Sequence, residues 1–374
     1  MVNLQVNYQN FMKTHVEKAW EFWKQFGDNP ICLAPMAEVN DLAFRLQCRL
    51  HNVKVCYTGM INSNQWIQGH KYQNRVFQTC QEDRPLIVQL AGSDYDTILS
   101  SAVDIGPLCD AVDLNLGCTQ HIAKRGGYGF FLVDTAEKRD EVIKLFEKLS
   151  TNVCVPVTAK IRIFTKTDEE NNEVPDPETT IEFAKQLQNA GVSVLAVHGR
   201  FQHRDKKANV FTDIIKKVVE TVEIPVIANG GVNSKSDAIE ILRETGAAGV
   251  MVGQALLANP TIFDNDFIEN ESERTLIKNT NLDHNNESDN KEQSNEQKDI
   301  VCDSNDDKDG RFSLRTIATE YLELAAKHPE KSLFYAKKHM FKFYESKIRQ
   351  APGTENKIKE AQTIEDLLKF VNEM

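Results

Sequence analysis

One pattern repeats from residue 31 to residue 252: a short run rich in Val, Ile, Leu and Ala, followed by a longer polar segment with helical spacing. Most of these runs are apolar without alternation, which is typical of strands buried on both faces. Eight such units predict an α/β fold of the TIM (β/α)8 barrel type, and they fit a doubly wound open sheet less well. The expected strands are 31–36, 53–58, 85–91, 109–115, 155–161, 192–198, 224–229 and 248–252. The expected crossover helices are 39–50, 63–78, 94–106, 136–150, 178–190, 209–221 and 235–245.

The rest of the chain is arranged around this barrel. We expect an N-terminal helix over 1–28 packed on the barrel, the barrel itself over 29–263, an acidic insertion over 264–310 and a small helical domain over 311–374. The insertion is mostly Asn, Asp, Glu, Ser, Lys and Gln, a composition that predicts disorder. Apolar residues at helical spacing, which usually form a core, identify the helices. They are Val16, Ala19, Trp20, Trp23 and Phe26 in the first helix, and Leu314, Ile317, Ala318, Tyr321, Leu322, Leu324, Ala325, Leu333, Phe334, Met340, Phe341 and Tyr344 in the last domain.

The net charge of -11 is unevenly distributed. The insertion holds 15 Asp and Glu against 5 Lys and Arg, a net of -10, so the rest of the chain sums to only -1. Residues 327–349 instead carry seven Lys and Arg against Glu330 and Glu345. Because local charge decides whether a polyanion can bind, this stretch predicts a nucleic-acid contact surface in the helical domain.

Two further features exclude classes of protein. No apolar run approaches the roughly 20 residues needed to cross a bilayer, and residues 1–30 carry charges and two Trp where a signal peptide would be apolar. The eight Cys show no CxxC pair and no regular spacing, which argues against a zinc ribbon and against a disulfide scaffold. We therefore expect reduced thiols in the cytoplasm or nucleus, without a metal and without membrane contact. We also expect a monomer.

Polar residues and glycines follow the expected strands, at the end where TIM barrels carry their active sites. Glycine turns after the seventh and eighth strands are typical of phosphate binding, although each alone could be a simple tight turn. Gln89 and Asn115 are amides able to recognise a flavin edge or a pyrimidine. Lys160 could stabilise negative charge on a reduced flavin, or form an ion pair across the mouth. His198 could hold the flavin or its phosphate, or be a structural histidine.

Cys118 differs from the other cysteines. Cys32, Cys56, Cys109 and Cys154 fall inside apolar runs and are expected to be buried. Cys118 lies instead on a loop with four glycines and three basic residues, among them Lys124 and Arg125. A thiol with a pKa of about 8.5 is mostly protonated at neutral pH, so it can act as a general acid as well as a nucleophile. An inert structural thiol is the alternative.

The strand ends closely resemble those of the FMN-dependent tRNA-dihydrouridine synthases. The motifs that carry the resemblance are Ala34-Pro35-Met36, Leu42-Ala43-Phe44-Arg45, Tyr57-Thr58, Arg84 to Gln89, Asp113 to Cys118, Lys160-Ile161-Arg162, Val197 to Arg200, Ile224 to Gly230 and Asn259-Pro260. Ile122 to Gly126, Glu320-Tyr321-Leu322 and His328-Pro329 are most similar to the eukaryotic subgroup acting on D-loop positions 16 and 17. Leu256 to Pro260 is also similar to the subgroup acting at 20a and 20b.

The resemblance implies FMN as cofactor, NADPH or NADH as reductant and tRNA as partner. It implies that Cys118 protonates C5 of the target uracil after reduced FMN delivers hydride to C6. Asn115 and Arg162 would face the uracil. Because of their positive charge, we also expect Lys124, Arg125, Lys337, Lys338 and Lys342 to contact tRNA. The implied FMN contacts are Pro35, Met36, Ala37, Gln89, Lys160, His198, Asn229, Gly230, Gly231, Gly253 and Gln254.

The chain departs from the family pattern at three places. Thr119 replaces the Pro that usually follows the catalytic Cys, Phe201 stands where the family commonly has Thr, and residues 265–310 have no recognised counterpart. Two alternatives stay open: a different FMN barrel that reduces a small enone or pyrimidine, and a tRNA-binding factor without catalysis. The basic helical domain argues against the first, and the presence of Cys118, Lys160 and His198 argues against the second.

Overall fold

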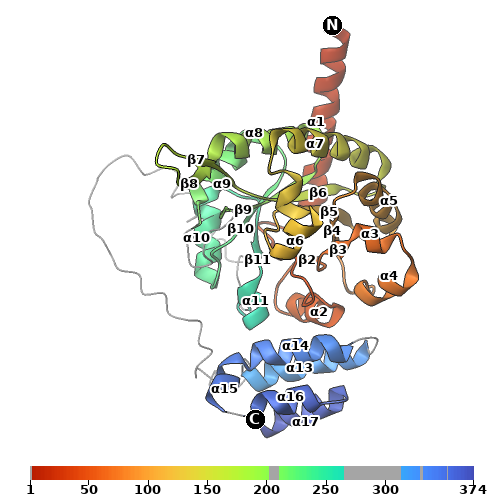
Figure 1. Ribbon diagram of the computed structural model, residues 1–374, viewed down its shortest axis with the longest axis vertical. Helices are drawn as coiled ribbons and strands as arrows, with labels where there is room; N and C mark the ends of the chain where they lie inside the picture. The colour runs from red at the N-terminus through yellow and green to blue at the C-terminus, as the bar shows by residue number, and fades with distance from the viewer. Residues whose placement is uncertain (1, 202–209, 265–312, 329–331, 352) are drawn as a thin grey trace, which may run out of the picture.

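A computed structural model describes residues 2–201, 210–264, 313–328, 332–351 and 353–374. Eight parallel strands form a closed barrel, because the sheet order β2-β1-β11-β10-β9-β6-β5-β4 is completed by a pairing of β2 with β4 (Figure 1). The predicted TIM barrel and all eight of its strands are confirmed. A two-residue strand, β3 (Ile61–Asn62), extends the sheet beside β4. The barrel strands are β1 (Ile31–Leu33), β2 (Val55–Tyr57), β4 (Leu86–Ala91), β5 (Ala111–Leu116), β6 (Val157–Arg162), β9 (Val194–His198), β10 (Val226–Asn229) and β11 (Gly249–Val252).

Helices surround the barrel, and several begin at side chains that accept a backbone N–H bond. Asp94, Thr135, Asp176 and Ser234 each cap the helix that follows, which satisfies a donor that would otherwise lack a partner. The corresponding helices are α5 (Tyr95–Ile105), α7 (Ala136–Asn152), α8 (Pro177–Asn189) and α10 (Lys235–Thr245), and α2 (Leu42–Leu50), α9 (Thr212–Thr221) and α11 (Gln254–Ala258) complete the set.

The helix expected over 63–78 is instead two short helices, α3 (Ser63–Trp66) and α4 (His70–Val76). Gly69 between them has φ 119, a value incompatible with a continuous helix. The sequence pattern also did not predict the hairpin β7 (Phe164–Thr167) with β8 (Glu173–Asp176), or the short helix α6 (His121–Gly126) after Cys118. Cys154 is exposed, contrary to expectation, because β6 begins only at Val157; Cys32, Cys56 and Cys109 are buried as predicted.

The barrel interior is apolar at the amino end of the strands and polar at their carboxyl end. Small and branched side chains fill the amino end, among them Val55, Ile87, Ala111, Val194 and Ile227. Helix α1 (Val2–Lys24) closes this end: Trp23 is only 2% exposed, and its indole donates to the carbonyl of Ala248 at 2.9 Å. Helix α1 therefore packs on the amino end of the barrel. The polar side chains that end the strands lie at the opposite, carboxyl end.

The C-terminal helices lie against the other side of the barrel, next to α2 and α11 (Figure 1). Asp41 at the start of α2 accepts from Tyr321 at 3.0 Å and contacts the buried His339 at 2.9 Å. Ile317, Tyr321 and Met340 are buried as predicted, whereas Phe334 is 54% exposed. The helices are α13 (Leu314–Lys327), α14 (Ser332–Phe343), α15 (Glu345–Gln350), α16 (Thr354–Glu360) and α17 (Ile364–Glu373).

The acidic insertion predicted over 264–310 lies outside the described residues, apart from Asp264. Within the described ranges, no helix is both long and apolar enough to span a membrane.

Candidate functional site

The predicted strand-end residues meet at the carboxyl end of the barrel because neighbouring strands hold them in register. Asn115 on β5 pairs with Lys160 on β6, and Arg162 on β6 pairs with His198 on β9. His198 pairs in turn with Asn229 on β10. Side chains of register partners in a parallel sheet point to the same face, so these five residues line one end of the barrel interior.

Gln89 and Asn115 form a buried chain of hydrogen bonds. Gln89 is fully buried, its Nε2 donates to Asp113 Oδ2 at 2.8 Å, and its Oε1 accepts from Asn115 Nδ2 at 2.8 Å. Thr158 Oγ1 donates to the other oxygen of Asp113 at 2.7 Å. Asp113 and Thr158 received no role in the sequence analysis. Burial raises the pKa of Asp113 to about 6, while the bonds from Thr158 and Gln89 oppose that shift.

Cys118 stands at the edge of this network, partly exposed, on the loop between β5 and α6. Its backbone N–H donates to Asn115 Oδ1 at 2.9 Å, and its carbonyl accepts from Phe130 at 3.0 Å. Gly117 adds a second N–H bond to Asn115 Oδ1, at 3.1 Å, and its carbonyl accepts from Arg162 Nε, also at 3.1 Å. The loop that presents the thiol is therefore fixed at several points on the barrel.

Two cations lie beside the thiol. Burial lowers the pKa of Lys160 to about 8, with a further decrease from the charge of Arg162 and opposing effects of Asp113 and Cys118. Burial also lowers the pKa of Arg162 to about 10, against the effect of Cys118. Arg162 is held by the carbonyls of Gly117 and Arg200, whereas the side chain of Lys160 forms no hydrogen bond with another described residue. An ion pair across the mouth, the alternative considered for Lys160, is thus not formed within the described part of the chain.

His198 and the glycine turn after β10 form the next part of the site. The buried Nδ1 of His198 has no hydrogen-bond partner within the described residues. Burial and the charges of Arg162 and Lys160 hold the pKa of His198 well below its usual value, so the ring is neutral at pH 7. Gly230 and Gly231 have φ values of 115 and 80, and a Cβ on Gly230 would lie 3.5 Å from His198 Nε2. Only glycine adopts two such conformations in succession readily.

The remaining predicted cofactor residues lie on the β1 and β11 sides of the mouth. Met36 is half-buried, its Sδ lies 3.9 Å from Nε2 of the exposed Gln254, and a Cβ on Gly253 would lie 3.4 Å from that sulfur. Pro35 is half-buried, and Ala37 is exposed. Asn229 is buried and donates to the carbonyl of Met251 at 2.8 Å, so its amide supports the turn.

These features suit an anionic, phosphorylated cofactor such as FMN. Among the described residues, the Lys160 ammonium has no ion-pair partner and Nδ1 of His198 has no hydrogen-bond partner, and the turn at Gly230 and Gly231 leaves room for a close backbone approach. The residues present therefore fit the cofactor implied by the sequence.

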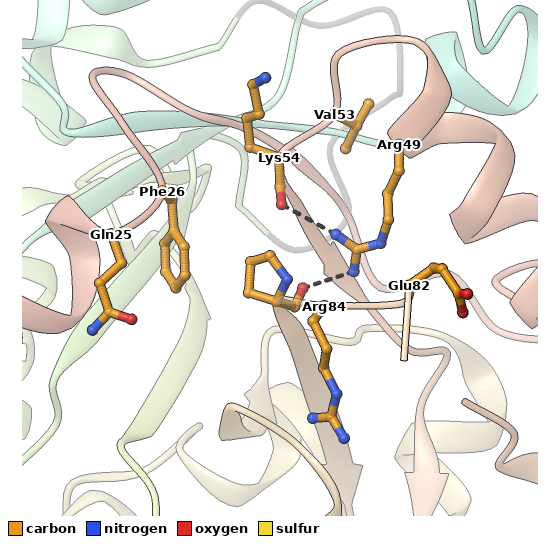
Figure 2. Close-up of a pocket in the computed structure, with 8 residues that line it drawn as sticks. Gln25, Phe26, Arg49, Val53, Lys54, Glu82 and Arg84 are labelled. Atoms are coloured by element: carbon orange, nitrogen blue, oxygen red, sulfur yellow. Dashed lines mark hydrogen bonds between the residues drawn. The ribbon is translucent and has the colours of Figure 1, made fainter. Parts of the chain in front are cut away.

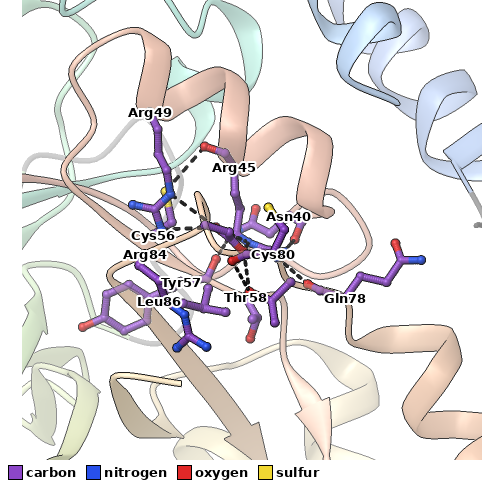
Figure 3. Close-up of polar contacts among 12 residues, drawn as sticks. Asn40, Arg45, Arg49, Cys56, Tyr57, Thr58, Gln78, Cys80, Arg84 and Leu86 are labelled. Carbon is purple, nitrogen blue, oxygen red and sulfur yellow. Dashed lines mark hydrogen bonds and ion pairs between the residues drawn. The ribbon is translucent and has the colours of Figure 1, made fainter. Parts of the chain in front are cut away.

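A buried ionic network holds the β1–α2 loop that carries Pro35, Met36 and Ala37 (Figure 3). Asp83 is fully buried between Arg45 and Arg49, with its shortest contact, 2.6 Å, to Arg45. Arg45 also donates to the carbonyl of Asn40 at 2.5 Å, and Asn40 in turn donates to the carbonyls of Ala34 and Tyr57. Arg45 belongs to a motif noted in the sequence, but its supporting role depends on Asp83, which the sequence did not single out.

The basic residues predicted to contact tRNA are divided between the Cys118 loop and α14. Lys124 and Arg125 are exposed on α6. Lys337 donates to the carbonyl of Lys359 at 2.7 Å, and Lys342 pairs with Glu345 at 3.1 Å. Lys338 pairs with Glu38 on the barrel and lies 4.5 Å from the ring centroid of Phe334. Each of these three lysines thus has an internal partner, and their role in tRNA binding stays a prediction.

A concavity of about 330 Å³ lies at the opposite end of the barrel, lined by residues that precede β1, β2 and β4 (Figure 2). Its Arg49 donates to the carbonyls of Lys54 and Pro85. Because TIM barrels place their chemistry at the carboxyl end, the polar mouth around Cys118 is the better candidate. Fold and mouth together define a (β/α)8 barrel with a thiol and two cations where an anionic cofactor would fit.

Comparison with known proteins agrees with this description. The model of the family described as "Dihydrouridine synthase (Dus)" matches residues 32–364. The chain therefore belongs to the dihydrouridine synthase family, which confirms the resemblance inferred from the motifs.

Named relatives come from the eukaryotic subgroups. The chain is 38% identical over 253 residues to a Schizosaccharomyces pombe protein named tRNA-dihydrouridine(16/17) synthase, covering 65% of this chain and 59% of that protein. It is 37% identical to a Rattus norvegicus protein named as 16/17 synthase-like, covering 66% and 55%. A Homo sapiens protein named as 20a/20b synthase-like is 35% identical, covering 62% and 69%. The chain thus spans less than two thirds of the length of the two 16/17 relatives.

Proposed function

We propose that this protein reduces a D-loop uridine of tRNA to dihydrouridine, with FMN as its cofactor and NADPH or NADH as reductant. One observation carries the proposal: the partly exposed thiol of Cys118 is fixed at the barrel mouth beside Lys160 and Arg162, in a chain of the dihydrouridine synthase family. The relatives named above support a tRNA substrate, and those with the highest identity support positions 16 and 17.

Lys160, His198, Gly230 and Gly231 would hold FMN, together with the chain at Gly253. Bound FMN supplies the hydride that goes to C6 of the uracil. Lys160 would provide positive charge to stabilise a negatively charged reduced ring, and its pKa of about 8, lowered by burial and by the charge of Arg162, leaves the ammonium the main form at pH 7. His198, neutral at pH 7, can donate one ring N–H to an anionic or carbonyl oxygen.

Cys118 supplies the proton that completes the addition. When the C5–C6 double bond receives hydride at C6, its electron pair moves to C5, which takes the proton from Sγ of Cys118 and leaves a thiolate. Lys160 and Arg162 lie close enough to stabilise that thiolate. The uracil must leave the base stack to reach this mouth, and Asn115 and Arg162 would orient it there.

The proposal is tested by mapping dihydrouridine in tRNA from cells that lack this protein. We expect dihydrouridine to be lost at positions 16 and 17 and kept elsewhere. Re-expression of the parent or of Cys154→Ala should restore it, because Cys154 is an exposed cysteine outside the site, whereas Cys118→Ala should not. Unchanged dihydrouridine in the deletion strain would contradict the proposal.

A further inference from the structure

We propose that Asp113 is a positioning residue for Cys118: its carboxylate fixes the direction of a hydrogen-bond chain that runs through Gln89 and Asn115 to the backbone N–H of Cys118. Asp113 does not reach the mouth, because it is fully buried one register level below Asn115. Its effect on the reaction would therefore pass through other side chains. The meaning of this role for catalysis rests on the proposed function.

The chain crosses three strands in a single continuous path. It starts at Thr158 on β6, passes to Asp113 on β5 and to Gln89 on β4, and returns to Asn115 on β5. It ends at the N–H groups of Gly117 and Cys118, at 3.1 and 2.9 Å from Asn115 Oδ1. None of its four side chains is more than 7% exposed.

Both ends of the chain independently impose the same direction. An amide side chain can be turned by 180°, but an ionised carboxylate only accepts hydrogen bonds and a backbone N–H only donates. Asp113 therefore requires Nε2 of Gln89 on its side, which turns Oε1 toward Asn115. Gly117 and Cys118 require Oδ1 of Asn115 on their side, which turns Nδ2 toward Gln89. The two requirements are compatible, because they place a donor, Nδ2 of Asn115, opposite an acceptor, Oε1 of Gln89.

Reversing any link would place two donors or two acceptors face to face in a buried site, where unsatisfied polar groups are costly. Asp113 thus determines the geometry of the thiol loop without touching a substrate. Replacing Asp113 by Asn gives Gln89 a partner that can either donate or accept, so only the N–H groups of Gly117 and Cys118 still impose the direction.

Exchanging the carboxylate and the amide between positions 113 and 89 of the hydrogen-bond chain tests this role. In the double variant Asp113→Asn/Gln89→Glu, the new amide can accept from Thr158 and donate to the new carboxylate, which still accepts from Asn115. The direction at Asn115 and the number of buried carboxylates are both preserved. The single variant Asp113→Asn removes the buried carboxylate and with it one of the two constraints on the direction. Asp140→Asn, which changes an exposed residue of α7, is the matched control.

Two readouts do not depend on turnover: hydrogen exchange of the backbone amides at 117–118, and the rate of Cys118 alkylation by iodoacetamide, both followed by mass spectrometry. We expect Asp113→Asn to accelerate both by about tenfold, the effect of losing one buried hydrogen bond, and the double variant to return within about threefold of the parent. A folded Asp113→Asn with parental rates would overturn the proposal, and so would a double variant that is as fast as the single variant. If Asp113→Asn does not fold, the double variant decides alone, since it should fold and protect the loop. None of these results depends on whether tRNA is the substrate.

Discussion

Gly129 lies directly against Cys118: a Cβ on Gly129 would be 2.7 Å from the carbonyl oxygen of Cys118 and 2.8 Å from its Cβ. Backbone atoms cannot move aside as a flexible side chain can, so the thiol loop requires glycine at this position. Gly127, two residues earlier, has a similar φ of 64 but would place its Cβ no closer than 3.6 Å to Ser93. The two positions share backbone strain and differ in contact with Cys118.

We therefore predict that Gly129→Ala slows the oxidation of reduced enzyme by tRNA at least about tenfold, because a contact this short must displace the loop. Reduction of the flavin by NADPH should stay within about twofold of the parent. Gly127→Ala carries only the cost of its positive φ, so it should resemble the parent in both steps. Stopped-flow measurement of the two half-reactions checks this prediction, and equal effects of the two variants would contradict it.

Lys160 should make FMN affinity depend on pH. Its pKa of about 8 means that the ammonium is lost as pH rises through 8, and the neutral amine no longer attracts an anion. We expect the Kd for FMN to be constant near pH 7 and to rise by up to about tenfold per pH unit above 8. Fluorescence titration checks this. Lys160→Met should bind FMN more weakly and with a flat profile between pH 7 and 9; a parental slope in this variant would assign the titration to another group.

His51 should stabilise the junction of barrel and helical domain in a pH-dependent way. It contacts Asp264 at 2.7 Å and Glu320 on α13 at 2.8 Å. Burial opposes protonation, but the hydrogen bonds and charges of Glu320 and Asp264 outweigh it and raise the pKa of His51. A raised pKa gives stability that is complete below the unfolded value of about 6.5 and is lost as pH rises through the folded value.

We expect His51→Gln to lower the free energy of unfolding by about 1 kcal/mol at pH 6 and by less as pH increases. Urea unfolding at several pH values measures the difference. His70→Gln, which changes an exposed histidine of α4, should show no such trend. A destabilisation by His51→Gln that is equal at pH 6 and pH 9 would rule out the ionic junction.

The lysines of α14 should make tRNA binding depend on salt. An ammonium has three donors, so the single internal bonds of Lys337 and Lys342 leave donors for phosphates. Replacing Lys337, Lys338 and Lys342 by Ala should weaken tRNA binding and lower the salt slope by about 0.9 for each phosphate that is no longer neutralised. Glu38→Gln breaks the anchor of Lys338 but keeps its charge, so it should leave the slope unchanged. Parental binding by the triple variant at all salt concentrations would refute this surface.

The sequence predicted the barrel and its mouth because both follow from local patterns. Apolar runs identify the strands, and parallel pairing brings their carboxyl ends together, so Asn115, Lys160 and His198 could be placed near one another in advance. The hydrogen-bond and ion-pair partners that support the site could not be predicted in this way. Asp113 meets Thr158 only through the register of β5 and β6, and Asp83 meets Arg45 across 38 residues. The β7–β8 hairpin contains the polar segments Phe164–Thr167 and Glu173–Asp176, which lack an apolar strand pattern.

Single-turnover oxidation of the FMN-loaded, reduced enzyme tests the proposed activity most directly. Unmodified tRNA should oxidise the parent and gain dihydrouridine in equal amount, whereas free uracil and orotate should not. Cys118→Ala should bind FMN and accept electrons from NADPH like the parent but oxidise at least about a hundredfold more slowly with tRNA, the usual contribution of a general acid. Oxidation by free uracil or orotate without reaction with tRNA would contradict the proposed activity, and an unchanged rate in Cys118→Ala would remove the thiol from the mechanism.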